Sequence, residues 1–200
     1  SDFNTKTAAQ TLTATLSAAA AATDKVYVSV DDGSNWVDKT AGMTGADPDV
    51  SLSTSITLSG TSVIKIKVTD AAGNDGATAS TSYTLDQTAP TISFASVDIS
   101  ADTGTSAADF NTKTAAQTLT GTLSAAMASG DVLKVSVDAG SSWSDVTSSV
   151  TGTPDTALST AITLSGTSAI HLRITDDAGN VGDADTTSYI LDTTAPTITY

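Results

Sequence analysis

The sequence predicts an all-β protein made of two antiparallel β-sandwiches in tandem. The first observation is a repeat: residues 2–18 read DFNTKTAAQTLTATLSA, residues 109–125 read DFNTKTAAQTLTGTLSA, and only Ala14 and Gly121 differ. The second is the offset of 107 (109 minus 2), which is too long for a solenoid repeat and matches a whole small β domain. The third is an alternation of apolar and polar residues with period two, without helical periodicity.

The second copy shows the expected strands in order. After the breaker Ala89-Pro90, a first strand is expected at 91–98, followed by a loop at 100–109. Alternating residues such as Leu119, Leu133 and Ile170 are expected to face inward. Further strands are expected at 117–123, 133–137, from Trp143, 161–164, 169–175 and 186–191. Roughly seven short strands separated by Gly, Asn and Asp turns describe a Greek-key sandwich.

The same plan sets the domain boundaries. Residues 1–88 are predicted to form a first repeat that lacks its first strand, and residues 89–194 a complete second repeat. Residues 195–200 match the start of the second copy and are expected to be the first strand of a following repeat. We therefore expect the chain to be a fragment of a longer protein.

Composition excludes several classes of function. All 22 acidic residues are Asp, only eight are Lys or Arg, and the formal net charge is −14, so we expect no nucleic-acid partner. There is no Cys for a disulfide or a thiolate metal site. No apolar run approaches membrane-spanning length, so no direct membrane insertion is expected, and the first residues show no signal peptide.

The preference for Asp over Glu has two interpretations. Glu favours helices and Asp favours turns, so a protein without helices has little use for Glu. Alternatively, short carboxylates in loops are good hard-oxygen ligands for Ca²⁺. Composition alone leaves both open.

Several strings recur at matching places in the two copies. Residues 85–90 (LDQTAP) and 191–196 (LDTTAP) bracket each copy, and 69–74 (TDAAGN) and 175–180 (TDDAGN) precede the last strand. The third strand is followed by 29–36 (SVDDGSNW) or by 136–143 (SVDAGSSW), and 102–104 (DTG) precede Asp109.

In order and spacing these strings resemble the bacterial immunoglobulin-like (Ig-like) repeats of giant surface adhesins, such as the extender repeats of RTX adhesins and biofilm-associated proteins. The resemblance covers essentially the whole chain. It implies tandem Ig-like antiparallel β-sandwiches (Greek key), end to end. It also implies an extracellular stalk on the bacterial cell surface, often stiffened by Ca²⁺, that holds a distal adhesive domain away from the cell.

Strand direction in an Ig-like sandwich determines which loops share a pole. At the one complete junction, the pole of copy one and the facing pole of copy two would then bring eight oxygen-bearing side chains together. These are Asp2, Asp31, Asp32 and Asp86 from copy one, and Asp131, Asp176, Asp177 and Asn180 from copy two. Ca²⁺ takes six to eight oxygens, so a junction Ca²⁺ is predicted. The alternative is that these are solvated turn residues.

A second Ca²⁺ candidate lies within the second copy, in the loop that contains Asp102 and Asp109. A Gly-containing loop with two carboxylates and free carbonyl groups could wrap an ion. An ordinary acidic loop explains the same residues equally well.

No catalytic constellation is found. The strings ending in Trp36 and Trp143 match the Asp-box pattern of sialidases, but a sialidase needs several arginines and the chain has only Arg173. We therefore interpret both strings as turn scaffolds. The offset between the copies falls from 107 at Trp36 and Trp143 to 106 at Pro48 and Pro154, so the only histidine, His171, corresponds to Lys65 (171 minus 106). It is expected on an outward strand face. We expect the protein not to be an enzyme.

The sequence thus predicts a structural spacer for cell adhesion, whose partners are the neighbouring repeats of its own chain. One alternative is a carbohydrate-binding module of a secreted protein, which would need a repeated platform of exposed aromatic residues. Such a platform is not repeated, because the counterpart of the outward-facing Tyr27 in the second copy is Lys134. Another alternative is a filament subunit that self-associates weakly, head to tail, when the strand at 197–200 fills the vacancy in a neighbour.

Overall fold

The computed structural model describes residues 3–18, 20–44 and 50–199. The chain forms two compact units, Ser1–Gln87 and Thr88–Tyr200, where the sequence placed the boundary between 88 and 89. Within the described ranges, helical structure is confined to two 3₁₀ turns, η1 (Thr40–Gly42) and η2 (Thr147–Ser149). No helix among these residues has the length and apolar character needed to span a bilayer.

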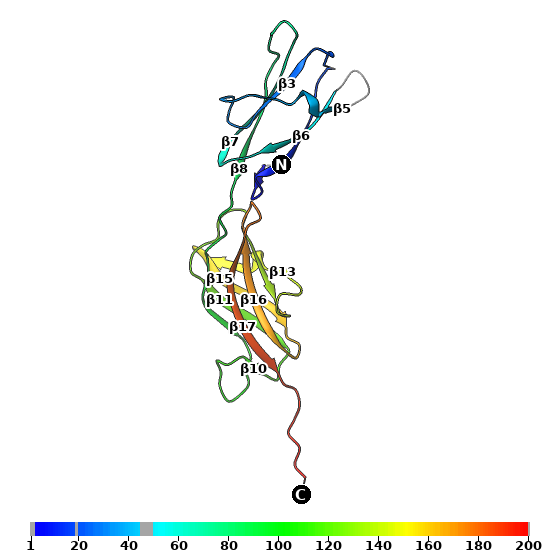
Figure 1. The fold of residues 1–200 in the computed structure, drawn as a ribbon. Helices are drawn as coiled ribbons and strands as arrows, with labels where there is room; N and C mark the ends of the chain where they lie inside the picture. The colour runs from blue at the N-terminus through cyan, green and yellow to red at the C-terminus, as the bar shows by residue number, and fades with distance from the viewer. Residues whose placement is uncertain (1–2, 19, 45–49, 200) are drawn as a thin grey trace. The chain divides into compact units, whose positions relative to one another are not determined.

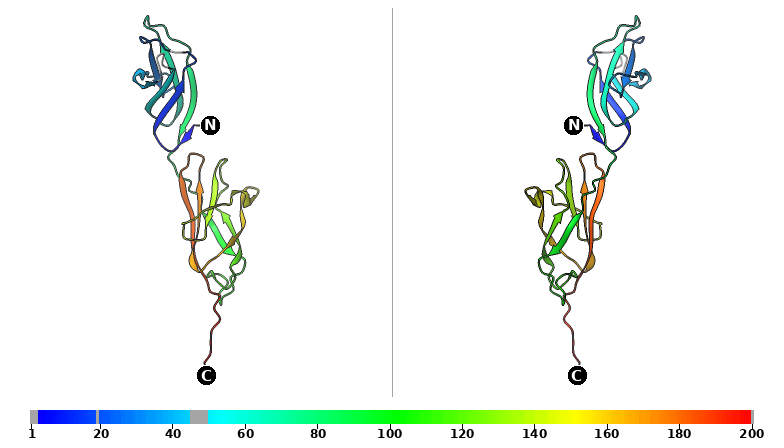
Figure 2. Two further views of the ribbon diagram at one scale, coloured as in Figure 1. Left: turned by 90° about the vertical axis from the view of Figure 1, so that its right-hand side faces the viewer. Right: turned by 90° about the vertical axis from the view of Figure 1, so that its left-hand side faces the viewer.

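The second unit is a sandwich of two sheets, whose layers are visible in Figures 1 and 2. One sheet has the order β14-β15-β11-β9 and the other β10-β17-β16-β12-β13. All neighbours are antiparallel except β10 and β17, which run parallel. The strands are β9 (Phe94–Ile99), β10 (Asn111–Thr112), β11 (Ala116–Leu123), β12 (Val132–Ser136), β13 (Ser144–Asp145), β14 (Val150–Gly152), β15 (Asp155–Thr163), β16 (Thr167–Thr175) and β17 (Val181–Leu191).

The first unit repeats this arrangement with one difference. Its sheets have the orders β1-β8-β7-β3-β4 and β2-β6-β5, and β1 again runs parallel to β8. No strand in the described part of this unit takes the place of β9, so β2 is an edge strand. The strands are β1 (Asn4–Thr5), β2 (Ala9–Thr15), β3 (Lys25–Ser29), β4 (Val37–Asp38), β5 (Met43–Thr44), β6 (Ser51–Thr57), β7 (Thr61–Thr69) and β8 (Ala79–Leu85). The predicted all-β fold is confirmed.

Each unit buries its own core between its two sheets. The inward side chains of the second unit include Leu119, Leu133 and Ile174, each fully buried, as the period-two alternation predicts. The counterparts Leu12 and Val26 are buried in the first unit. Both cores consist mainly of aliphatic side chains, together with one buried tyrosine each, Tyr83 and Tyr189.

Some predicted strand limits are wrong. The first strand of the second unit begins at Phe94 rather than at 91, because the preceding residues cross the sandwich without ladder pairing. The strand predicted at 161–164 is longer, and the one predicted at 186–191 begins at Val181. Residues 192–199 form no strand, and Figure 1 draws them as a plain coil, because a strand requires a sheet partner.

Candidate functional site

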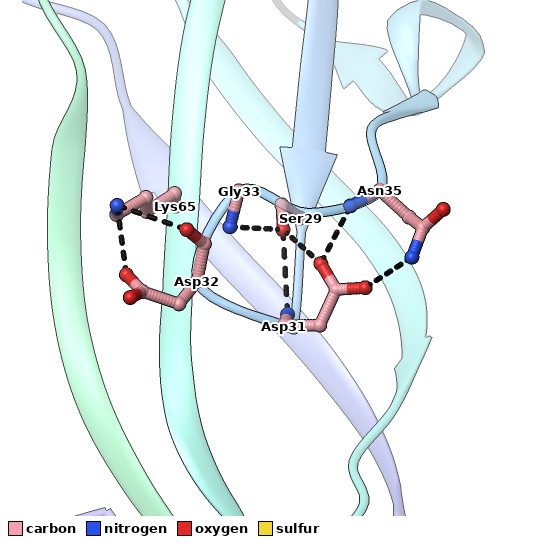
Figure 3. A network of polar contacts seen from close by, with 6 residues as sticks. All are labelled: Ser29, Asp31, Asp32, Gly33, Asn35 and Lys65. Atoms are coloured by element: carbon pink, nitrogen blue, oxygen red, sulfur yellow. Dashed lines mark hydrogen bonds and ion pairs between the residues drawn. The ribbon is translucent and has the colours of Figure 1, made fainter.

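A tight turn follows β3, and its polar network is drawn in Figure 3. The Ser29 hydroxyl donates to Oδ1 of Asp31 at 2.7 Å. The backbone amide of Asn35 donates to Oδ1 at 2.8 Å, and its side-chain amide to Oδ2 at 2.6 Å. These bonds from Ser29 and Asn35 favour the ionised carboxylate and lower the pKa of Asp31 to about 2. Both oxygens of Asp31 thus build the turn.

Asp32, the next residue, has a different role in the same turn. Its backbone has a positive φ of 59°, a conformation that Asp tolerates better than most residues. Its carboxylate forms an ion pair with Lys65 at 2.7 Å, and the Lys65 ammonium also donates to the Asp32 carbonyl oxygen at 3.0 Å (Figure 3). Asp32 is therefore paired within its own unit.

The second unit repeats this turn around Asp138. Hydrogen bonds from Ser136 and Ser142 lower the pKa of Asp138 to about 2. Beneath the turn, the Trp143 indole donates to the Gly140 carbonyl oxygen at 2.9 Å. The two strings that match the Asp-box pattern are turn scaffolds, as their residues predict.

Cations cover one ring face of each tryptophan. The Arg173 guanidinium lies 3.8 Å from the centre of the Trp143 ring, and the Lys67 ammonium lies 4.7 Å from that of Trp36. His171 contacts Trp143 edge-on, with 6.4 Å between ring centres. A ring face that holds a cation is not free to stack on a sugar. The sequence pattern did not reveal that Lys67 and Arg173 would lie on the tryptophan rings.

The candidate residues Asp131, Asp176, Asp177 and Asn180 lie in two adjacent loops of the second unit. A Cβ atom on Gly130 would lie 3.1 Å from the Asp177 side chain, so the two loops touch. Asp131 accepts the Ala128 amide at 2.9 Å. Asp176 accepts the backbone and side-chain amides of Asn180 at 2.8 and 2.9 Å. The structure therefore brings these residues to one pole and uses the Asp131 and Asp176 carboxylates in turn bonds.

The candidates of the first unit do not form one cluster. The Asp32 amide bonds the Val63 carbonyl oxygen, whereas the Asp86 amide bonds that of Thr5, beside the Gly60 end of β7. Gly60 and Val63 are three residues apart, which is about 10 Å along an extended chain. Asp2 lies outside the described residues. Among residues 3–18, 20–44 and 50–199, no three His, Asp or Glu residues are grouped to hold a metal. The junction Ca²⁺ stays a prediction.

Asp102 has the clearest opening for a cation. Its Oδ2 accepts the backbone amides of Asp109 and Phe110 at 3.0 and 2.8 Å. Its Oδ1 is buried and has no hydrogen-bond partner in the described part of the chain. A buried carboxylate oxygen without a donor is costly, and a hard cation would satisfy it. Ca²⁺ at the loop with Asp102 and Asp109 stays a prediction, as does the alternative of an ordinary acidic loop.

Comparisons with known proteins show no family. No protein-family model and no curated protein matches the chain. Among solved structures, it is similar to a biofilm associated protein BSP domain, with 17% identity and a TM-score of 0.25, over 88% of this chain and 26% of that one. It is also similar to Bacteroides ovatus mixed-linkage glucan utilization locus protein SGBP-B in complex with a mixed-linkage heptasaccharide, with 14% identity, a TM-score of 0.24, and coverage of 92% and 41%. The chain spans less than half of either, and scores this low carry no argument about function.

Proposed function

We propose that this chain is a structural spacer: tandem extender repeats of a bacterial cell-surface adhesin that act outside the cell and project a distal adhesive domain. The observation that carries the proposal is the repetition of one architecture, in which the described part of the first unit lacks only a strand in the place of β9. Both units have the same sheet of five strands in the same order, including the parallel pair of β1 with β8 and of β10 with β17. Each unit fills its own core.

Repeated domains of this kind are better suited to lengthening a protein than to catalysis. A second copy of a catalytic site on one chain adds little, whereas every further copy of a self-contained domain adds reach. The polar groups that recur in both units, such as Asp31 and Asp138, are used to shape turns. The tryptophans at these turns hold cations on their ring faces, which favours the spacer over a carbohydrate-binding platform.

The spacer proposal is tested by varying the number of repeats. Chains with the 89–194 unit present once, twice and four times would be compared by small-angle X-ray scattering. We expect the maximum dimension to grow by a constant increment for each added unit. A dimension that levels off as units are added would contradict the proposal. Binding of the present chain to a glycan array, lost on replacing Trp36 and Trp143, would favour the carbohydrate-binding alternative.

Stiffening by Ca²⁺ is the second part of the proposal. It is supported by the unsatisfied oxygen of Asp102 and by the run of candidate oxygens at one pole of the second unit. With Ca²⁺ bound, Asp102 and Asp109 would supply carboxylate oxygens, and loop carbonyl groups and water would complete the shell. The same scattering series, repeated in EDTA, tests this part: we expect smaller and more variable dimensions without Ca²⁺.

A further inference from the structure

The first unit contains both Asp-Gly dipeptides of the chain, Asp32-Gly33 and Asp75-Gly76. Glycine has no Cβ atom, so its amide nitrogen can approach the side chain of the preceding residue more closely than the amide of any other residue can. Both carboxyl groups are accessible, because the Asp32 and Asp75 side chains are 62% and 51% exposed. At such a dipeptide a protein chain can form a cyclic imide without an enzyme.

The reaction joins the amide nitrogen of the glycine to Cγ of the aspartic acid. The carboxyl group loses its hydroxyl group and the amide loses its hydrogen, together one water molecule, and a five-membered succinimide ring results. A second water molecule then opens the ring at either carbonyl group. Opening at the former main-chain carbonyl gives isoaspartate, in which the main chain runs through the side chain and gains one methylene group. Nothing is oxidised or reduced, and water is the only co-reactant.

A lysine holds the Asp32 carboxylate away from Gly33. The Lys65 ammonium contacts this carboxylate at 2.7 Å and also donates to the Asp32 carbonyl oxygen at 3.0 Å. The carboxylate therefore lies on the side of the carbonyl oxygen, and the Gly33 amide donates to the Ser29 hydroxyl oxygen at 2.8 Å. Figure 3 shows the carboxylate turned toward Lys65 and the Gly33 nitrogen turned toward Ser29. The two groups that would react are thus engaged by different partners.

Lys67 has the same relation to the second dipeptide. Its ammonium donates to Oδ2 of Asp75 at 2.6 Å, and the Thr69 hydroxyl donates to Oδ1 at 2.6 Å. The Gly76 amide donates to the Val68 carbonyl oxygen at 2.8 Å. The carboxylate and the amide of this dipeptide are therefore both bonded to the end of β7 instead of approaching each other.

The second unit lacks both the dipeptides and the lysines. At the first place Ala139 and His171 replace Asp32 and Lys65, and at the second place Val181 and Arg173 replace Asp75 and Lys67. Ala139 has a φ of 56°, close to the 59° of Asp32, so this turn forms without the ion pair. At both places the Asp-Gly dipeptide and its lysine are present together or absent together, which points to a role for the lysine at the dipeptide.

We propose that Asp32 and Asp75 are sites of isoaspartate formation, and that Lys65 and Lys67 are positioning residues that slow this reaction in the folded chain. The modification changes the fold locally, because the extra methylene group enters the turn after β3 in one case. In the other case it enters the β-bridge between Thr69 and Asp75. This inference is independent of the spacer function and makes the first unit the part of the chain that ages chemically at these positions.

The first test compares the folded chain with the chain in concentrated urea. Isoaspartate is measured after incubation at physiological temperature, by peptide mapping with electron-transfer fragmentation. In urea we expect it to accumulate at Asp32 and Asp75 at similar rates, because the lysines no longer hold either carboxylate. In the folded chain both rates should be lower. No isoaspartate at either site in urea, or equal rates with and without urea, would overturn the proposal.

The second test removes each lysine in turn from the full chain. Lys65→Met should raise the rate at Asp32 alone, and Lys67→Met the rate at Asp75 alone. Each increase should be about two- to fivefold, the factor that corresponds to loss of one exposed ion pair. Each aspartate is thus the internal control for the other. Unchanged rates, or a rise at both sites from either variant, would refute the assignment to the lysines.

Two further variants separate positioning from general stability. Lys67→Arg should keep Asp75 protected, because the charge is retained and Arg173 shows that a guanidinium fits over the tryptophan ring. Lys25→Met removes the ion pair with Asp38, which is not followed by glycine, and should change neither rate. A rise at Asp32 or Asp75 in Lys25→Met would mean that any lost ion pair accelerates the reaction, and would contradict a specific role for Lys65 and Lys67.

Discussion

The hydroxyl group of Tyr189 donates a hydrogen bond of 2.7 Å to the carbonyl oxygen of Val137 and thereby joins β17 to the end of β12. Tyr83 makes the same bond to Val30 in the first unit, at 2.8 Å. Both tyrosines are almost fully buried. The same bond therefore ties the last strand of each sandwich to the residue just after β3 or β12.

Removal of this hydroxyl group should weaken the fold. Tyr189→Phe leaves the Val137 carbonyl oxygen without its partner, and we expect a loss of about 1–2 kcal/mol in the free energy of unfolding. Urea unfolding followed by Trp143 fluorescence, in a Trp36→Phe background, reports on the second unit alone. The control belongs to the first unit and is read through Trp36 in a Trp143→Phe background: Tyr27→Phe, on the outer face beside Lys67, should change the stability of that unit little. An effect of similar size from both variants would argue against a specific role for the Val137 bond.

A pair of glycine variants tests the close contact of residues 89–94 with β17 in the second unit. Gly182→Ala places a methyl group against the Pro90 carbonyl oxygen, and overpacking of this kind costs about 1–3 kcal/mol. Gly76→Ala meets only the Val68 carbonyl oxygen, at 3.3 Å, and should change stability by less than about 1 kcal/mol. Thermal unfolding of each unit, followed by its own tryptophan, measures both. Equal melting shifts would mean that 89–94 does not press on Gly182.

The turn carboxylates give the protein a defined acid sensitivity. The folded-state pKa values of Asp31 and Asp138 are about 2, below the ordinary 3.8. Their contribution to stability is thus complete above about pH 4 and is lost as the pH falls through about 2. Ser136→Ala removes the main hydrogen bond on Asp138 and should raise its pKa. Carboxyl ¹³C NMR titration measures the pKa of Asp138, with Asp31 of the same molecule as internal control. An unchanged Asp138 pKa would show that the Ser136 hydrogen bond does not lower it.

Ca²⁺ should raise the melting temperature of the second unit. Binding only to the folded state adds about 2.7 kcal/mol at a hundredfold excess over Kd. Asp102→Asn should remove much of this gain, because Oδ1 of Asp102 is the unsatisfied oxygen. Asp155→Asn removes the same charge from an exposed strand end and serves as the control. A melting curve that is identical in Ca²⁺ and in EDTA would exclude an ion at this loop.

The long strands could be predicted from local pattern, and the short ones could not. Leu133 and Ile170 alternate with polar neighbours, and the structure buries both. In contrast, β10 contains two residues and exists only because β17, some eighty residues later, lies beside it. The turn role of Asp31 followed from its Ser, Gly and Trp neighbours. The absence of a first strand from the first unit could be predicted from the repeat, whereas the side chains left uncovered beside Ala14 could not, because they depend on how the two sheets pack.

The parallel pairing of β10 with β17 has a mechanical consequence. When a unit is stretched from its two ends, β10 is drawn one way and β17 the opposite way along their common direction. The bonds from the Ile190 amide to the Phe110 carbonyl oxygen and from the Asp192 amide to that of Thr112 then bear the load together, in shear. Antiparallel hairpins loaded from one end open bond by bond like a zipper. In the second unit this pair bears load in shear once the force has passed β9, which precedes β10 in the chain and pairs with β11.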